Sequence, residues 1–250
     1  MKRGETMKTV AIYSHKGGVG KTMTAVNLAY NLTQYGKRVL LVDMDQQGNA
    51  SSLYRCYDLS KKSVYDMLSS RCRPQGAKRR TRYQGLDIIP ANIELKELRY
   101  GDMKQGHETL KTALEAMEEN YDYCIIDCPP SAGLCVRLAL KAADEVIIPL
   151  KASTFAKEGL STVLDTIADA GDIKIAGCLF TMFSKNATAL NVINDVIHTY
   201  DCTVFENVIR RSSSVEYSEF RKKPLLKCAS RSAAALDYMD FTEEFLKTEG

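Results

Sequence analysis

The sequence contains no apolar run long enough to span a bilayer, and residues 1–6 have no apolar segment of the kind found in secretion signals. No Pro- or Ser-rich stretch divides the chain, which has 250 residues and is 45% hydrophobic. These absences argue against a secreted or membrane-inserted protein and against several linked domains. We therefore expect a cytoplasmic protein in which residues 7–250 form a single domain around one large core, preceded by a disordered tail at residues 1–6.

Metal-binding and disulfide patterns are absent as well. The eight cysteines include no Cys-x-x-Cys pair, and the three histidines, at positions 15, 107 and 198, share no ligand spacing. Several cysteines lie within apolar runs, where a thiol packs as a small hydrophobic group, and a cytosolic chain of this size needs no disulfide. We therefore predict buried free thiols, and histidines without a catalytic or metal-binding role.

A glycine-rich loop is the most informative segment that is present. It has the sequence Lys-Gly-Gly-Val-Gly-Lys-Thr over residues 16–22, which we call the phosphate loop. Alternating, β-branched residues predict a strand at 9–13 before it, and apolar residues at helical spacing predict a helix after it, ending near Gly36. A strand, a glycine turn and a helix start in this order direct several backbone N–H groups and the positive end of the helix dipole at one point. That arrangement favours a bound phosphate.

Three side chains of the phosphate loop add chemistry. Lys21 can reach the β- and γ-phosphate oxygens of a nucleotide, and the Thr22 hydroxyl is placed to bind Mg²⁺. Lys16 is needed for neither task, because a second ammonium group beside Lys21 adds repulsion unless further negative charge arrives. The extra lysine therefore requires an explanation beyond one subunit.

With Lys16 included, the phosphate loop resembles the deviant Walker A motif of the ParA/MinD family of P-loop ATPases. The resemblance implies that Lys16 crosses a nucleotide-sandwich dimer to reach the phosphates bound by the partner, as an arginine finger does. It also implies that ATP and Mg²⁺ are the cofactors and that Lys16 and Lys21 serve catalysis. The implied nucleotide-binding residues are Lys16, Gly17, Gly18, Val19, Gly20, Lys21, Thr22 and Met23.

Two further segments that end in carboxylates fit the same family. The apolar run at 39–42 predicts a buried parallel strand, and Asp43 and Asp45 follow at positions that place both side chains on one face. The resemblance implies that Asp45 orients the attacking water, with Asp43 as a support near the metal. For Asp43, simple solvation of a strand end stays open as an alternative. Gln46 stands where the family usually has proline, so we expect a less rigid turn here.

The second of these segments, residues 121–131, predicts another buried strand, which ends at Asp127 and is stopped by Pro129 and Pro130. It resembles the family's Walker B motif and switch II region. In these the aspartate holds Mg²⁺ through water, and the following turn senses the γ-phosphate. The resemblance therefore implies a metal site made by Thr22, Asp43 and Asp127.

The rest of the chain predicts alternating helices and strands. After Asp127 we expect helices at 133–143, 156–170, 190–198 and 232–246, and strands at 146–150, 173–180 and 203–209. This order is typical of an α/β fold in three layers, with a doubly wound, mostly parallel sheet and helices on both faces. Ligands should bind at the carboxyl ends of the strands, where the motifs converge. The resemblance covers nearly the whole chain from Met7 onward.

Positive charge is concentrated in two clusters, although the net charge is only +3. The first is an acid-free run in a predicted loop, made of Arg71, Arg73, Lys78, Arg79, Arg80 and Arg82. A solvated loop explains this run as well as phosphate binding does. The second cluster falls in residues 209–225, a region that contributes to DNA binding and to the nucleotide pocket in the family, and contains Arg210, Arg211, Arg221, Lys222 and Lys223. Within this region Arg210 replaces the family's usual proline, and Ser214 replaces a commonly basic residue.

The C-terminal segment distinguishes branches of the family. MinD-type members end in a basic amphipathic helix that binds anionic lipid. This chain instead ends in the acidic set Asp237, Asp240, Glu243, Glu244 and Glu249. We therefore expect no membrane attachment. We expect the last helix to pack onto the sheet through Leu236, Met239, Phe245 and Leu246.

The resemblance as a whole implies a ParA-like ATPase for plasmid or chromosome partition, associated with the nucleoid. Such a protein binds nonspecific double-stranded DNA as an ATP-dependent sandwich homodimer, and a ParB-like centromere-binding protein stimulates the hydrolysis that releases it. One alternative is a MinD-like ATPase that positions another cargo or the cell-division machinery. The other is an iron–sulfur carrier using Cys124, Cys128 and Cys135, although the Gly-rich cysteine turns of the related nitrogenase iron protein are lacking. Residues 183–188 are assigned no role.

Overall fold

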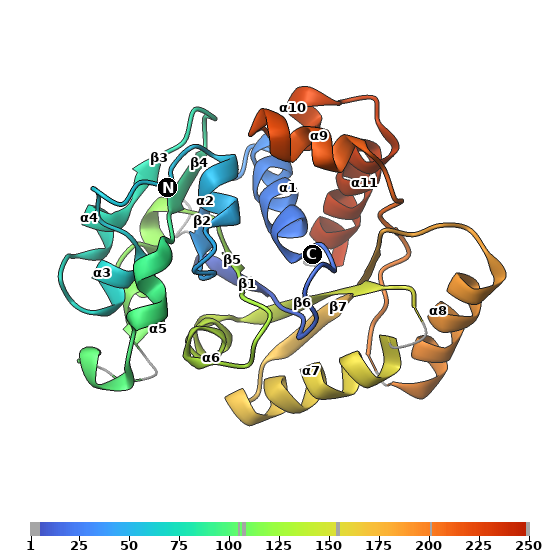
Figure 1. Cartoon of the computed structure of the whole chain (residues 1–250), viewed down its shortest axis with the longest axis horizontal. Helices are drawn as coiled ribbons and strands as arrows, with labels where there is room; N and C mark the ends of the chain where they lie inside the picture. The colour runs from blue at the N-terminus through green and yellow to red at the C-terminus, as the bar shows by residue number, and fades with distance from the viewer. Residues whose placement is uncertain (1–5, 105, 107–108, 154–155, 201, 249–250) are drawn as a thin grey trace.

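A seven-stranded sheet forms the centre of the molecule (Figure 1). The computed structural model describes residues 6–104, 106, 109–153, 156–200 and 202–248, so residues 1–5 of the predicted tail lie outside it. In this part of the chain the strand order is β3-β4-β2-β5-β1-β6-β7, and only the β3–β4 pair is antiparallel. The strands are β1 (Lys8–Ile12), β2 (Val39–Asp43), β3 (Arg79–Arg80), β4 (Leu86–Ile89), β5 (Tyr123–Asp127), β6 (Glu145–Lys151) and β7 (Lys174–Thr181).

Helices cover both faces of the sheet, which confirms the predicted three-layer α/β fold (Figure 1). One face is covered by α1 (Lys21–Gln34), α2 (Asn49–Leu53), α10 (Leu225–Cys228) and α11 (Ala233–Thr248). The other is covered by α3 (Val64–Leu68), α4 (Pro74–Ala77), α5 (Thr109–Glu115), α6 (Leu134–Ala142), α7 (Ala156–Ala170) and α8 (Ala187–Thr199). Helix α9 (Ser214–Arg221) lies beside α10, and the 3₁₀ turns are η1 (Ile93–Glu97), η2 (Tyr100–Asp102) and η4 (Glu118–Asn120).

The three central strands place the sequence motifs together. Strands β2 and β5 are buried along their whole length, and β1 is buried from Thr9 onward, as expected for parallel strands covered on both faces. In the register of the sheet, Asp127 stands beside Ile12 on one side and Asp43 on the other. The carboxyl ends of β1, β2 and β5 therefore meet at one edge, where the phosphate loop begins.

The predicted strand at 203–209 is wrong. One isolated bridge pairs Val204 with Cys178 of β7, and the Ile209 N–H donates to the Phe180 carbonyl at 2.8 Å, but no continuous ladder forms. Between its contacts, the backbone N–H groups of Glu206 and Asn207 donate to the Glu244 carboxylate on α11, at 2.6 and 3.0 Å. A backbone whose N–H groups are used by a side chain cannot complete a ladder with the neighbouring strand, so the sheet ends at β7.

The packing face of the last helix differs from the prediction in part. Leu236 is 48% exposed, whereas Tyr238, Phe241 and Phe245 are buried. The Phe245 ring meets Tyr123 of β5 edge to face at 6.0 Å between centroids, so the helix does pack onto the sheet as expected. Its apolar face is thus occupied within the molecule. Among the described residues, no helix is long and apolar enough to cross a membrane.

Candidate nucleotide site

The phosphate loop joins β1 to α1 in a backbone shape that needs glycine. Gly18 and Gly20 have φ angles of +70° and +86°, in the left-handed region that L side chains rarely adopt. The end of β7 supports the loop from outside, because the Thr181 hydroxyl donates a hydrogen bond of 2.7 Å to the Val19 carbonyl. The loop is therefore fixed in shape before any ligand arrives.

Lys21 begins α1 and lies inside the loop. Its ammonium group donates a hydrogen bond of 2.8 Å to the Lys16 carbonyl, and the side chain is buried. Burial lowers the pKa of Lys21, while the charge of Asp127 acts in the opposite direction. A buried cation at the start of a helix, next to exposed backbone glycines, suits a phosphate anion.

Asp127 is a buried carboxylate without a counterpart. It ends β5 at zero exposure, and neither of its oxygens has a hydrogen-bond partner of good geometry among the described residues. Burial raises its pKa well above the ordinary value and the Asp43 charge adds to the shift, while Thr22 and Lys21 act against it. A cation close to Thr22 and Asp127 would remove this penalty, so the residues fit a hard ion that takes oxygen ligands, such as Mg²⁺.

Asp43 is used differently from the neighbouring Asp127. One oxygen accepts from the Ser51 backbone N–H at 2.8 Å and hydroxyl at 2.6 Å, and the other accepts from the Asp45 N–H at 3.1 Å. Burial raises the pKa of Asp43 to about 6, although these hydrogen bonds oppose the shift. The Asp45 N–H belongs to the turn and Ser51 belongs to α2 just beyond it, so Asp43 fixes both ends of that turn. It does more than solvate the end of a strand.

Asp45 opens a tight turn. Its side chain accepts from the Gln47 N–H at 2.9 Å, and its carbonyl accepts from the Gly48 N–H at 2.8 Å. Gln46 is exposed between these contacts. The two hydrogen bonds and the left-handed Gly48, with φ +63°, hold the turn that proline restricts elsewhere in the family.

The phosphate loop and Asp45 line one cavity of about 430 Å³, the nucleotide cavity, whereas Asp43 and Asp127 are not among its walls. The predicted residues among its walls are Gly17, Gly18, Gly20, Lys21, Thr22, Met23 and Asp45. The remaining walls are Asn49, Ser52, Leu53, Pro130, Met182, Val215 and Glu219. Pro130 belongs to the predicted switch II turn, and Val215 and Glu219 lie on α9, within the region that the resemblance relates to the nucleotide pocket. Met182 was not predicted, although it directly follows the carboxyl end of β7, where ligands of parallel sheets bind.

Lys16 stands apart from the nucleotide cavity. Its side chain lies over Gly159 of α7, so closely that a Cβ atom at Gly159 would be 2.9 Å from the Lys16 Cε. A side chain at this point of the helix would require the end of the lysine to shift. In the single subunit, Lys16 therefore lies against its own α7 at the margin of the phosphate loop.

The predicted DNA-binding residues lie around α9 and are not equivalent. Arg210 forms an ion pair with Asp237 of α11, at 2.6 Å. Arg221 donates to the Tyr217 hydroxyl at 2.7 Å and lies over its ring. Arg211 and Lys222 are exposed, and Lys223 is half-buried. Arg211 and Lys222 are thus the more accessible cations of the cluster.

The cysteines and histidines have unremarkable positions. Cys124 and Cys128 are buried, Cys135 is half-buried, and burial raises the pKa of each thiol, that of Cys135 to about 11. In the described part of the chain, no group of three His, Cys, Asp or Glu side chains is arranged to hold a metal ion. His15 and His198 are exposed, and His107 lies outside the described residues.

A doubly wound sheet with this phosphate loop, an acid at the end of β5 and a second acid after β2 defines an ATPase of the P-loop class with a deviant Walker A motif. Comparison with known proteins narrows the class. Residues 7–176 match a family described as AAA domain. The chain is 39% identical over 246 residues to the sporulation initiation inhibitor protein Soj of Bacillus subtilis, covering 95% of this chain and 97% of Soj.

Two further comparisons agree. The chromosome partitioning protein ParA of Caulobacter vibrioides is 34% identical, with 97% of this chain and 95% of ParA covered. A crystal structure named as cobyrinic acid a,c-diamide synthase from Mycobacterium smegmatis, with bound ADP and magnesium, is 32% identical with a TM-score of 0.82, covering 97% of this chain and 95% of that one. The chain belongs to the ParA/Soj family of partition ATPases.

Proposed function

We propose that this protein is a partition ATPase whose two copies close over a pair of ATP molecules and then hold DNA. The observation that carries the proposal is the unpaired, buried Asp127 beside Lys21 and Thr22 at the mouth of a rigid phosphate loop. Such a site is unfavourable while empty and becomes favourable when a nucleotide and a divalent cation supply the missing charges. ADP and magnesium bound in the M. smegmatis structure support the same pair of ligands.

The residues of the site have separate tasks. Lys21 and the backbone N–H groups of residues 17–22 bind the phosphates, and Lys21 neutralises charge that develops in the transition state. Thr22 and Asp127 would hold Mg²⁺, which supplies charge neutralisation on the phosphates when bound. Asp43 fixes the turn, and Asp45 orients the attacking water from the wall of the nucleotide cavity.

Lys16 makes the site incomplete in one subunit. It belongs to the phosphate loop but lies on α7, outside the nucleotide cavity. We assign it to the triphosphate of a second copy of the chain, where an added cation would neutralise phosphate charge. ATP binding then favours the homodimer because each nucleotide contacts both subunits.

The dimer binds nonspecific double-stranded DNA through phosphate contacts. The proposed contacts are Arg211, Arg221, Lys222 and Lys223. Arg210 contributes indirectly, because its ion pair with Asp237 holds this segment against α11. Hydrolysis, stimulated by a ParB-like centromere-binding protein, separates the subunits and releases the DNA. In this cycle the protein associates with the nucleoid and moves a plasmid or a chromosome origin.

The test compares the size of the protein with ATP and with ADP, and then its retention on DNA. We expect a dimer with ATP and a monomer with ADP, and DNA retention that weakens steeply with salt. Lys16→Ala should bind nucleotide yet stay monomeric and lose DNA retention. Asp45→Ala, which keeps the binding residues, should still dimerise and bind DNA while ATP turnover falls. Equal DNA binding with ADP, or a monomer when ATP is bound and hydrolysis is blocked, would contradict the proposal.

A further inference from the structure

A second cavity, larger than the nucleotide cavity, lies on the part of the chain that carries the first basic cluster. It has a volume of about 860 Å³ and shares no lining residue with the nucleotide cavity. Its charged lining contains seven cations and three acids: Arg55, Lys61, Lys62, Arg71, Lys78, Arg79 and Arg80, with Asp58, Asp66 and Glu94. We call this cavity the basic pocket. The proposed ATPase cycle gives it no role.

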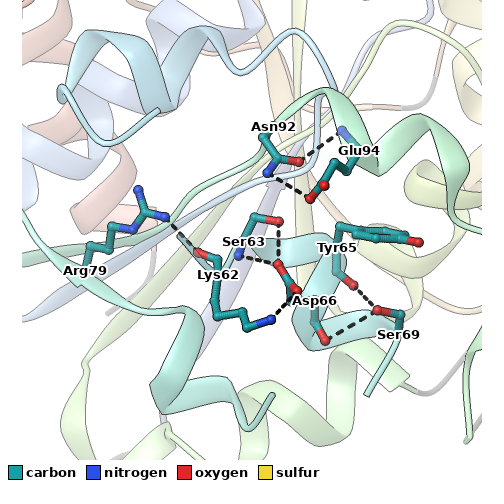
Figure 2. A network of polar contacts seen from close by, with 8 residues as sticks. All are labelled: Lys62, Ser63, Tyr65, Asp66, Ser69, Arg79, Asn92 and Glu94. Atoms are coloured by element: carbon teal, nitrogen blue, oxygen red, sulfur yellow. Dashed lines mark hydrogen bonds and ion pairs between the residues drawn. The ribbon is translucent and has the colours of Figure 1, made fainter. Parts of the chain in front are cut away.

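The walls of the basic pocket are tied together by one arginine. Arg79 of β3 donates to the Cys56 carbonyl and, at 2.8 Å, to the Lys62 carbonyl. Figure 2 shows the guanidinium group of Arg79, on β3, directed at the backbone of Lys62. The edge of the sheet and the segment before α3 are therefore held at a fixed separation, so the cavity exists before any ligand binds.

The acids of the pocket are already satisfied by local partners. Asp66 accepts from the Ser63 N–H at 3.0 Å and pairs with Lys62 at 3.0 Å, which Figure 2 shows side by side. Asp58 accepts from the Ser60 N–H at 2.9 Å and its hydroxyl at 2.7 Å. Glu94 accepts from the Asn92 side-chain amide at 3.3 Å, so each acid is held by a residue of its own segment, and the remaining charge of the lining is positive.

Several cations of the pocket are positioned for an external anion. The Arg71 guanidinium lies 4.7 Å from the centre of the Tyr65 ring, which orients it without using all of its N–H groups. Arg55, on the segment after α2, and Arg80, on β3, are exposed and both line the pocket. A concave site with several arginines favours an anion with many oxygens close together, because each guanidinium group can bind two of them at once.

We propose that the basic pocket binds a compact polyphosphate anion, meaning a small molecule with two or more adjacent phosphate groups. A duplex DNA backbone fits these observations less well, since it presents its phosphates along a convex surface rather than inside a cavity. The pocket is separate from the phosphate loop, so the chain has two anion sites. Helix α2 is the segment between them, because Asn49 and Leu53 line the first cavity and Arg55 lines the second.

The test is calorimetric titration of the full chain with inorganic tripolyphosphate, with excess ADP present to fill the phosphate loop. The pocket variant is Arg55→Ala with Arg80→Ala. Its matched control is Arg73→Ala with Arg82→Ala, which removes the same charge from exposed residues of the same region that do not line the pocket. We expect the pocket variant to weaken binding by about tenfold or more, because two charge-assisted contacts are lost, and the control to change it by less than about threefold.

Two further measurements separate the alternatives. Tripolyphosphate binding must persist in Lys21→Ala, which weakens anion binding by the phosphate loop. The affinity of the protein for a short DNA duplex must fall no further in the pocket variant than in the control. If either double variant has a lowered melting temperature, the corresponding single variants replace it. The proposal is overturned if tripolyphosphate does not bind at millimolar concentration, if both double variants weaken it equally, or if only the duplex distinguishes them.

Discussion

Arg210 and Asp237 form a bidentate ion pair that joins the segment after β7 to helix α11. The Arg210 Nε atom lies 3.0 Å from both carboxylate oxygens, its Nη2 atom lies 2.6 Å from one of them, and its backbone N–H donates to the other at 2.8 Å. The Asp237 side chain is only 8% exposed, whereas that of Arg210 is 53% exposed. The pairing explains how an arginine takes the place of the family's usual proline, since both fix the backbone at this position.

This pairing predicts different effects for two adjacent arginines. Arg210→Ala should lower the melting temperature, because it leaves a nearly buried carboxylate without its cation. Arg211→Ala should leave the melting temperature unchanged, since Arg211 is exposed, and should reduce the salt dependence of DNA binding by about one charge. Melting curves and DNA titrations at several salt concentrations measure both effects. If Arg210→Ala changed only the salt dependence, the structural role given to Arg210 would be wrong.

Asp127→Asn should stabilise the nucleotide-free protein at neutral pH while abolishing Mg²⁺-dependent ATP turnover. Burial beside Asp43 on the next strand raises the pKa of Asp127, so folding opposes the ionisation of this carboxyl group at neutral pH, and asparagine removes that cost. Each kcal/mol recovered raises the melting temperature of a chain of this size by roughly 2–4 °C. Asp122→Asn is the control, since Asp122 pairs with Arg38 at 2.8 Å near the surface and should not be stabilised by losing its charge. Equal melting temperatures for wild type and Asp127→Asn would contradict this account.

Nucleotide binding with Mg²⁺ should release protons near pH 6. The pKa of Asp43 is raised to about 6 and that of Asp127 is raised well above its ordinary value, so the empty site holds protons that a cation displaces. Affinity for the Mg²⁺ complex should therefore rise with pH through this range. Titrations at pH 6 in buffers of different ionisation enthalpy measure the released protons, and no release would refute the prediction.

The same shifts determine how stability depends on pH. A carboxyl group with a raised pKa binds its proton more tightly in the native state than in the unfolded chain. The contribution of Asp43 to stability is therefore largest below the unfolded pKa of 3.8 and is lost as the pH rises to about 6. Asp43→Asn should remove this part of the pH dependence of the unfolding free energy, as measured by denaturant unfolding between pH 4 and 7.

Gly48→Ala should destabilise the turn after Asp45. Gly48 has a φ angle of +63°, and an added Cβ would lie 2.5 Å from a ring carbon of Tyr57. The left-handed backbone alone costs about 1–2 kcal/mol for a residue other than glycine. Combining Gly48→Ala with Tyr57→Ala removes the steric clash but not the backbone cost, so the double variant should keep part of the loss. Gly101→Ala, which meets no atom within 4 Å, is the control and should change unfolding by less than about 0.5 kcal/mol.

Thr181→Val should loosen the phosphate loop while conserving the shape of the side chain. The variant removes the hydrogen bond of 2.7 Å to the Val19 carbonyl, at a cost of about 1–3 kcal/mol if the carbonyl stays buried and unpaired. Nucleotide affinity should fall severalfold, as measured by calorimetry. Thr162→Val on α7 is a matched control, since its exposed hydroxyl donates at 3.2 Å to the Glu158 carbonyl of the same helix. Unchanged affinity in Thr181→Val would show that β7 does not support the loop.

Much of the fold and of the site could be predicted from local patterns. The buried runs of β1, β2 and β5, the helix after the phosphate loop and the acids at the strand ends all follow from residues close together in the sequence. The elements between Asn49 and Glu115 were not predicted, because their helices and strands are short and lack a long hydrophobic period. The strand predicted at 203–209 was wrong because Glu244, distant in sequence, accepts hydrogen bonds from the backbone donors that a strand would need.

The sequence alone determined the phosphate loop, the acids that follow the central strands and the class of reaction. The backbone freedom of glycine, the alternation of side chains along a strand and the residues that begin a helix all act over a few residues. Only the tertiary structure decided that Asp43 serves the turn while Asp127 stays unpaired, that Lys16 lies on Gly159, and that Arg210 belongs to Asp237. Each of these depends on which distant side chain supplies the partner. Hydrogen bonds and buried charges are satisfied in three dimensions, and packing brings their partners together from any distance along the chain.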